Sequence, residues 1–176
     1  LKGLALKGHE MILLSYERPK GIPADPGDTP PDRDLSRWFK LKYHKYPRLC
    51  ATIYDFAAGI LFAFYIIWKH RVDIVHARAT HGGLIGILPA RILRRKFIFD
   101  TRGLDSEEYA DGGLISRNGN LYNIMLSVER MLFRISDAII LLSRNALGLL
   151  RDNGLLETSG HKPLYVIPCN TDLAMF

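Results

Sequence analysis

Two short segments of this chain gather side chains that can bind or orient a polar substrate. The first, residues 76–83, follows a predicted strand, and its candidate substrate-binding residues are His76, Arg78, Thr80, Gly82 and Gly83. We expect the two glycines to lead into a helix, whose free amide groups and positive dipole end attract an anion or a sugar hydroxyl. A second interpretation stays open, in which His76 is a core histidine and the glycines form a plain tight turn.

The second segment follows the next predicted strand and carries a carboxylate and a guanidinium two residues apart. Asp100 can orient a substrate hydroxyl or accept its proton, and Arg102 can bind an anionic group. We therefore predict that Asp100 and Arg102 are the catalytic residues, the alternative being a structural ion pair that closes the loop. Glu107 is a further candidate for substrate binding, and a solvated charge near a helix N-terminus is the alternative for it.

For two more polar residues, we expect mainly a structural role. Ser143 follows a later strand and opens a helix, so its first expected role is that of an N-cap, and contact with the substrate is its second. Glu129 lies at the edge of an apolar helix stripe, where a buried carboxylate needs a partner. Arg102 or Arg130 could supply that partner, and we predict a structural role for Glu129.

The elements that position these residues alternate between strand and helix. Apolar runs predict strands at residues 9–16, 72–77, 96–100, 138–142 and 164–167. Other patterns predict helices at residues 49–70, 84–95, 120–136 and 143–153. In the helix 120–136, the predicted buried stripe is formed by Leu121, Ile124, Met125, Val128, Leu132 and Ile135. The pattern favours an α/β fold with a Rossmann-like parallel sheet and helices on both faces, in which ligands bind at the carboxyl ends of the strands.

One long stretch between the first two strands has no clear periodicity. Residues 19–34 are rich in Pro, Gly and Asp, so we expect a mobile or disordered loop region that extends over residues 19–47. Its end, residues 38–46, is aromatic and basic, and two interpretations stay open for it: contact with an anionic membrane surface, or packing as an ordinary helix. The apolar run 56–68 is too short for a membrane span of about 20 residues and is predicted to be a buried helix.

Composition limits the class of protein further. The 176 residues carry a net charge of +6, but the basic residues are scattered and show no nucleic-acid signature, so we expect no nucleic-acid partner. Two cysteines, Cys50 and Cys169, are too few for a disulfide framework or a zinc site and fit a cytoplasmic protein. There is no GxGxxG, Walker A, GxSxG, CxxC or HExxH motif. The sequence therefore predicts neither a metal ion nor a cofactor.

Taken in order, five segments resemble those of family-four glycosyltransferases, which have two Rossmann-like domains (the GT-B architecture). They are LALKGHE at 4–10, DIVHAR at 73–78, FDTRG at 99–103 followed by Glu107 and Glu108, ERMLFRISDAIILLS at 129–143, and VIPCNTDLAMF at 166–176. The family's second histidine is Arg78 here and cannot act as a base, because arginine stays charged. The family's Gly in the last segment is Asn170, which also tolerates a left-handed turn.

The resemblance implies metal-independent transfer of a sugar from a nucleotide-sugar donor, with retention at the anomeric carbon. It implies that residues 1–176 form a single N-terminal domain, which supplies the acceptor side of the site. The first strand and a C-terminal domain, which binds most of the nucleotide sugar, are expected to lie outside this sequence, so that the fragment alone is inactive. The acceptor would be a polysaccharide, a lipid-linked sugar or a small molecule, in cell-envelope polysaccharide synthesis, with peripheral contact at the inner face of the membrane.

Two other classes of protein remain open at this stage. One is a non-catalytic Rossmann-like binding or interaction domain, which would bind a ligand without a second domain. The other is a dinucleotide-dependent oxidoreductase, whose glycine fingerprint belongs to a first strand that this sequence lacks. For the oxidoreductase, only Glu17 could be the acidic residue at the end of the strand 9–16. The sequence does not identify the sugar, the acceptor or the oligomeric state.

Overall fold

The structure is a computed structural model and describes residues 4, 7–17, 37–44 and 46–168. The chain divides into two compact units, Leu1–Gly59 and Ile60–Phe176, and each is described by itself. Helix α2 (Arg48–Lys69) begins in the first unit and ends in the second.

The first unit contains two parallel strands, β1 (Ile12–Glu17) and β2 (Arg37–Lys42), paired from Ile12 opposite Arg37 to Glu17 opposite Lys42. The Trp38 indole donates a hydrogen bond to Oγ of Ser15 (2.9 Å), and the Lys40 ammonium lies 3.5 Å from the centre of the Trp38 ring. The prediction of one loop over 19–47 was therefore wrong at its end, and residues 38–42 are not helical. Residues 18–36 lie outside the described residues.

A buried carboxylate joins the end of this strand pair to α2. Asp55 of α2 accepts a hydrogen bond from the backbone amide of His44 (2.9 Å), lies 2.7 Å from its ring Nδ1, and is 6% exposed. The Tyr16 hydroxyl donates to the backbone carbonyl of Asp55. Burial pushes the pKa of Asp55 upward, but the hydrogen bonds from His44 outweigh it and hold this pKa below its ordinary value.

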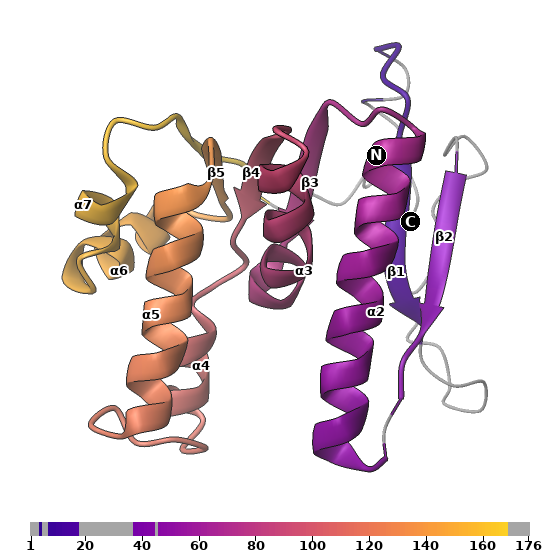
Figure 1. Ribbon diagram of the computed structural model, residues 1–176. Helices are drawn as coiled ribbons and strands as arrows, with labels where there is room; N and C mark the ends of the chain where they lie inside the picture. Colours follow the sequence, from indigo (N-terminus) through magenta and orange to yellow (C-terminus); the bar gives the residue numbers. More distant parts are fainter. Residues whose placement is uncertain (1–3, 5–6, 18–36, 45, 169–176) are drawn as a thin grey trace, which may run out of the picture. The chain divides into compact units, whose positions relative to one another are not determined.

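The second unit is built on a parallel four-stranded sheet in the order β3-β4-β5-β6 (Figure 1). The strands are β3 (Ile74–Arg78), β4 (Lys96–Asp100), β5 (Ala138–Leu141) and β6 (Leu164–Val166). The helices are α3 (Ala79–Ile92), α4 (Asp105–Asp111), α5 (Asn120–Ile135), α6 (Asn145–Asp152) and α7 (Leu155–Ser159). The predicted α/β fold with parallel strands and helices is confirmed, while the short helices α4 and α7 were not predicted.

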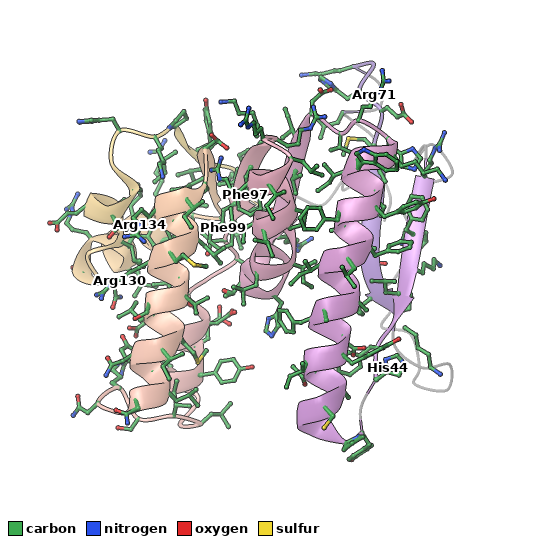
Figure 2. All side chains as sticks on the ribbon, in the orientation of Figure 1. His44, Arg71, Phe97, Phe99, Arg130 and Arg134 are labelled. Atoms are coloured by element: carbon green, nitrogen blue, oxygen red, sulfur yellow. The ribbon has the colours of Figure 1, made fainter. Side chains whose placement is uncertain are left out.

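Helix α3 approaches β3, β4 and α5 closely because of two glycines (Figure 1). A Cβ atom at Gly83 would come within 2.8 Å of Leu132 Cδ1, and one at Gly86 within 3.2 Å of Val75 Cγ1. The sheet meets these helices with the buried side chains of Phe97 and Phe99 (Figure 2). This packing places the beginning of α3 at the carboxyl end of β3.

The buried face of α5 differs from the predicted stripe. Leu121 and Ile124 are exposed, and the buried residues are Tyr122, Leu126, Glu129, Leu132 and Phe133. The predicted stripe was right for Leu132, which is fully buried, and for Val128 and Ile135, which pack partly buried against the core, but wrong for Leu121 and Ile124. It missed the apolar Leu126 and Phe133 and two polar side chains, Tyr122 and Glu129, which face partners on α4. Phe133 packs edge to face against Phe99, with ring centres 5.5 Å apart.

Helix α2 has an exposed side as well as a buried one. Among the residues described, Cys50–Lys69 is the one helical segment that is long and apolar enough, by length and composition, to cross a bilayer. Of its most apolar stretch, 33% is buried. The core helices of soluble proteins have the same length and composition, so this helix by itself does not indicate a membrane span. The expectation of a buried helix holds for Ala63, Ile66 and Ile67 but not for Leu61 and Trp68, which are exposed.

Candidate active site

The carboxyl ends of β3 and β4 bring three of the predicted site residues together. His76 lies on β3, Asp100 ends β4, and Arg102 follows two residues later. Oδ2 of Asp100 is 3.4 Å from Nε2 of His76 and 3.6 Å from Nη2 of Arg102. The structure therefore contains the pairing of Asp100 with Arg102 that their spacing suggested, and it adds His76 as a second partner of the same oxygen.

The other oxygen of Asp100 has an unusual environment. Asp100 is 7% exposed, and its Oδ1 is buried without a hydrogen-bond partner among the described residues. A buried acceptor without a hydrogen bond costs about 1–3 kcal/mol, so such atoms are rare outside functional sites and water sites. Oδ1 is thus free to accept a hydrogen bond from a hydroxyl that enters the site.

Arg102 belongs to a four-residue loop held at both ends. The Thr101 amide donates to the carbonyl of Ile140 on β5 (3.0 Å), which extends the sheet by one bond beyond β4. The Thr101 hydroxyl donates to the carbonyl of Gly103 (2.6 Å), and Leu104 is 2% exposed. This loop leads directly into α4, so the backbone on both sides of Arg102 is fixed.

Helix α3 begins at Ala79, five residues before the start that the sequence suggested. Thr80, Gly82 and Gly83 therefore lie inside the helix. The expectation that the two glycines precede the helix and lead into it was wrong, and so was the alternative of a plain tight turn. Gly83 lies within the helix because its lack of a side chain lets α3 pack closely against Leu132 and Phe99. Ala79 has a φ of +60°, a conformation that is strained for a residue with a Cβ atom.

This early start places the N-terminus of α3 at the end of β3. The first turn of the helix, which includes Thr80, contains no acidic residue, and Arg78 immediately before it is exposed. Amide groups in a first helical turn have no partner within the helix and carry the positive end of its dipole. Arg78, Thr80 and this helix end form a positively polarised border beside Asp100, which is opposite Arg78 in the strand register.

Glu107 has partners inside the protein. Its carboxylate accepts hydrogen bonds from the Tyr122 hydroxyl and from Arg117, whose Nη2 lies 2.8 Å away, and Glu107 is 8% exposed. The hydrogen bond from Tyr122, followed by that from Arg117, holds the pKa of Glu107 below its ordinary value. This geometry favours a structural role for Glu107, which ties α4 to α5 and to the loop that follows α4.

Ser143 binds an amide of the first turn of α6, as expected, although Arg144 occupies the N-cap position. Its hydroxyl accepts a hydrogen bond from the Ala146 amide (3.3 Å) at the start of α6. Ser143 and Arg102 both line a small open pocket of about 60 Å³ between the ends of β4 and β5, with leucine side chains including Leu104 and Leu150. The pocket is large enough for a few water molecules and too small for a whole sugar.

Glu129 has a partner that the sequence did not reveal. The predicted arginines are not its hydrogen-bond partners, and Arg130 donates to the carbonyl of Asn153 (3.2 Å). Instead, Glu129 accepts hydrogen bonds from the amide (3.0 Å) and the hydroxyl (2.6 Å) of Ser106. Burial raises the pKa of Glu129, and the hydrogen bonds from Ser106 counteract only part of that rise.

Among the described residues, no group of three or more His, Cys, Asp or Glu side chains is arranged to hold a metal ion. The cluster at the strand ends instead combines one buried carboxylate with cationic and hydrogen-bonding groups. Such a cluster can orient a hydroxyl group and bind an anion.

Comparison with known proteins decides the family. The sequence model described as Glycosyltransferase Family 4 matches residues 1–174. This chain belongs to glycosyltransferase family 4. The resemblance drawn from the five motifs is thereby confirmed, and the chain is part of an enzyme family.

A solved structure supports the fold independently. Sucrose-phosphate synthase from Thermosynechococcus elongatus is 18% identical to this chain, with a TM-score of 0.70, and the match covers 98% of this chain and 41% of that protein. At this identity the likeness shows the fold, which is that of a GT-B glycosyltransferase. No curated protein matches this chain.

Proposed function

We propose that this family 4 chain supplies the acceptor side of a retaining transfer of a sugar from a nucleotide-sugar donor. The acceptor is a polysaccharide, a lipid-linked sugar or a small molecule. The chain spans 41% of the length of the sucrose-phosphate synthase that it resembles, so a second domain of the same protein is proposed to bind most of the donor nucleotide. Membership of the family and the GT-B fold support the proposal.

The unpartnered oxygen of Asp100 is the observation that carries the proposal. Asp100 Oδ1 accepts a hydrogen bond from the reacting hydroxyl of the acceptor, while its Oδ2 is held by His76 and Arg102. The carboxylate orients the hydroxyl toward the donor sugar, and the proton leaves with the departing diphosphate. Asp100 therefore acts by orientation and charge, and a strongly basic group is not required.

The neighbouring groups bind the rest of the acceptor. Arg102, 26% exposed at its side chain, and the exposed Arg78 bind anionic or hydroxyl groups, with Thr80 at the start of α3 as a further donor. No metal ion or cofactor takes part in the proposed reaction. The protein is proposed to act in the cytoplasm, at or near the inner face of the membrane, in the synthesis of cell-envelope polysaccharide.

The test uses the full-length protein that contains this chain. Transfer and hydrolysis are assayed with a panel of nucleotide sugars for the parent, Asp100→Ala and Arg102→Ala, with nucleotide binding measured separately. The control is Asp73→Asn, which removes a carboxylate from a side chain that is 92% exposed and precedes β3. We expect Asp100→Ala to lower transfer by about 100-fold or more, with nucleotide binding retained.

Two outcomes would contradict the proposal. If Asp100→Ala transferred sugar at the parental rate, Asp100 would not belong to the site. If the parent turned over no donor while this domain bound a ligand, the protein would be a non-catalytic binding domain and not a transferase.

A further inference from the structure

Glu129 is a buried carboxylate that the proposed reaction does not use directly. It lies on α5, is 1% exposed, and accepts hydrogen bonds from the amide and the hydroxyl of Ser106, 23 residues earlier in the chain. Removing a carboxylate from water is unfavourable, and an apolar side chain of similar volume often stabilises a fold at least as well. The role of Glu129 therefore lies in the segment that its hydrogen bonds with Ser106 hold in place.

The hydrogen bonds of Glu129 fix the beginning of α4. Ser106 is the second residue of this helix, and the residue before the helix, Leu104, gives no side-chain cap. The first amide groups of a helix have no partner within the helix, and a carboxylate that accepts from them holds the helix end in position. Glu129 thus does from a neighbouring helix what a cap residue normally does from within the same segment.

The loop that carries Arg102 lies between this cap and the sheet. At one end of the loop, the Thr101 amide donates a hydrogen bond to the carbonyl of Ile140. At the other end, the Ser106 amide donates a hydrogen bond to the Glu129 carboxylate. Only four residues, 101–104, separate Asp100 from α4, so a shift at Ser106 must be absorbed where Arg102 lies. A contact of 3.6 Å between Arg102 and Asp100 cannot survive a shift of 1 Å or so without weakening.

We propose that Glu129 is a positioning residue, which sets the place of Arg102 beside Asp100 by anchoring Ser106 at the start of α4. This inference rests on the proposed function for its effect on the reaction, but its structural part stands on the contacts alone. It goes beyond the structural role expected for Glu129, because a purely stabilising residue would affect the protein independently of Arg102.

A double-mutant cycle on the full-length protein separates the two roles. Glu129→Leu is expected to lower kcat/KM for transfer by about 10-fold in the parent, mainly through kcat, and by less than about 2-fold when Arg102 is already alanine. Glu129→Gln keeps one oxygen that can accept from the Ser106 amide but replaces the oxygen that accepts from the Ser106 hydroxyl with an NH2 group. It should therefore show a smaller loss, about 3-fold, with the same dependence on Arg102. Because Gln preserves the shape of the side chain, this variant also answers the question if Glu129→Leu does not fold.

The matched control is Asp137→Asn. Asp137 accepts a hydrogen bond from the Phe97 amide (2.8 Å) and lies 3.1 Å from Arg91, which places it at the opposite end of β4 from Asp100. It is a carboxylate that holds a backbone amide, as Glu129 does, but at a distance from the loop 101–104. We expect its effect on kcat/KM to be the same in the parent and in Arg102→Ala.

Hydrogen exchange tests the structural part without any activity. In Glu129→Leu, the amides of residues 104–107 should exchange at least about 10-fold faster, and in Glu129→Gln by a smaller factor, while those of β4 and β5 keep the parental rate in both variants. Equal losses of kcat/KM in both backgrounds would overturn the positioning role and leave the proposed function intact. If the parent transfers no sugar, the proposed function fails. Unchanged hydrogen exchange of the amides of residues 104–107 in Glu129→Leu would separately overturn the anchoring of α4 by Glu129.

Discussion

Asp100 and His76 lie on neighbouring parallel strands, and their side chains meet at 3.4 Å at the carboxyl edge of the sheet. This contact joins two segments that the sequence identified separately. It holds one oxygen of Asp100 and leaves the other, Oδ1, buried and without a hydrogen-bond partner in the described part of the chain. The geometry is that of a carboxylate prepared to receive a hydroxyl group.

Replacing His76 should affect the reaction more than the fold. The His76 side chain is 43% exposed and that of Asp100 10%, so the contact reaches solvent on the histidine side. A contact that is solvated in this way contributes only about 0–1 kcal/mol. We expect His76→Gln to lower kcat/KM for transfer by about 10-fold, because Asp100 loses one of its two fixed partners, and to leave the melting temperature almost unchanged. Steady-state kinetics and thermal unfolding measure the two effects. A large loss of stability without a loss of rate would mean that His76 is a core histidine.

Two adjacent glycines of α3 should respond differently to the same substitution. A Cβ at Gly83 would lie 2.8 Å from Leu132 Cδ1, so Gly83→Ala should lower the free energy of unfolding by about 1–3 kcal/mol. The nearest atom to a Cβ at Gly82 is a backbone carbon 3.9 Å away, so Gly82→Ala should be neutral or slightly stabilising in a helix. Urea unfolding of the two variants gives the comparison, and equal effects would contradict the close packing of α3.

Glu107 should make the stability of the protein depend on pH on the acidic side. Its hydrogen bonds from Tyr122 and Arg117 hold its folded-state pKa below its ordinary value of 4.5. The stabilisation is therefore fully present above pH 4.5 and is lost as the pH falls through the lower, folded-state pKa. We expect Glu107→Gln to lower the free energy of unfolding at pH 7 by about 1–3 kcal/mol and to flatten its decrease below pH 4.5.

The control for this prediction is Glu108→Gln, which removes the adjacent, exposed carboxylate. Unfolding in urea between pH 3 and pH 7 should show the change in slope for the variant of Glu107 alone. The same slope in Glu107→Gln as in the parent would show that its carboxylate is not held by these partners.

The sheet could be predicted well because its strands are plain apolar runs. Strand β4 has the predicted bounds, Lys96–Asp100, and the position of Asp100 at its end follows from that alone. The start of α3 could not be predicted, because it depends on a positive φ at Ala79 and on the close packing of Gly83. Both are tertiary effects, which local propensity does not contain.

Polar partners were the least predictable part of the candidate site. The proximity of Asp100 and Arg102 follows from a spacing of two residues, but their contact with His76 requires the register of β3 and β4. The Glu129 carboxylate needed a partner, as expected, yet the partner is a serine 23 residues away on α4, a helix too short to give a periodic pattern. Strand β2 was missed because its alternating basic and aromatic residues follow a long Pro-rich and Gly-rich stretch.

The most direct test of the central claim separates the binding of the acceptor from that of the donor. Kinetics of the full-length protein, with the donor saturating and the acceptor varied, are compared for the parent, Asp100→Asn and the exposed control Asp73→Asn. The account predicts that Asp100→Asn loses about 100-fold in kcat/KM for the acceptor while the Kd for the nucleotide is unchanged. A loss of nucleotide affinity equal to the loss of kcat/KM, or no loss of either, would contradict the assignment of Asp100 to the acceptor side.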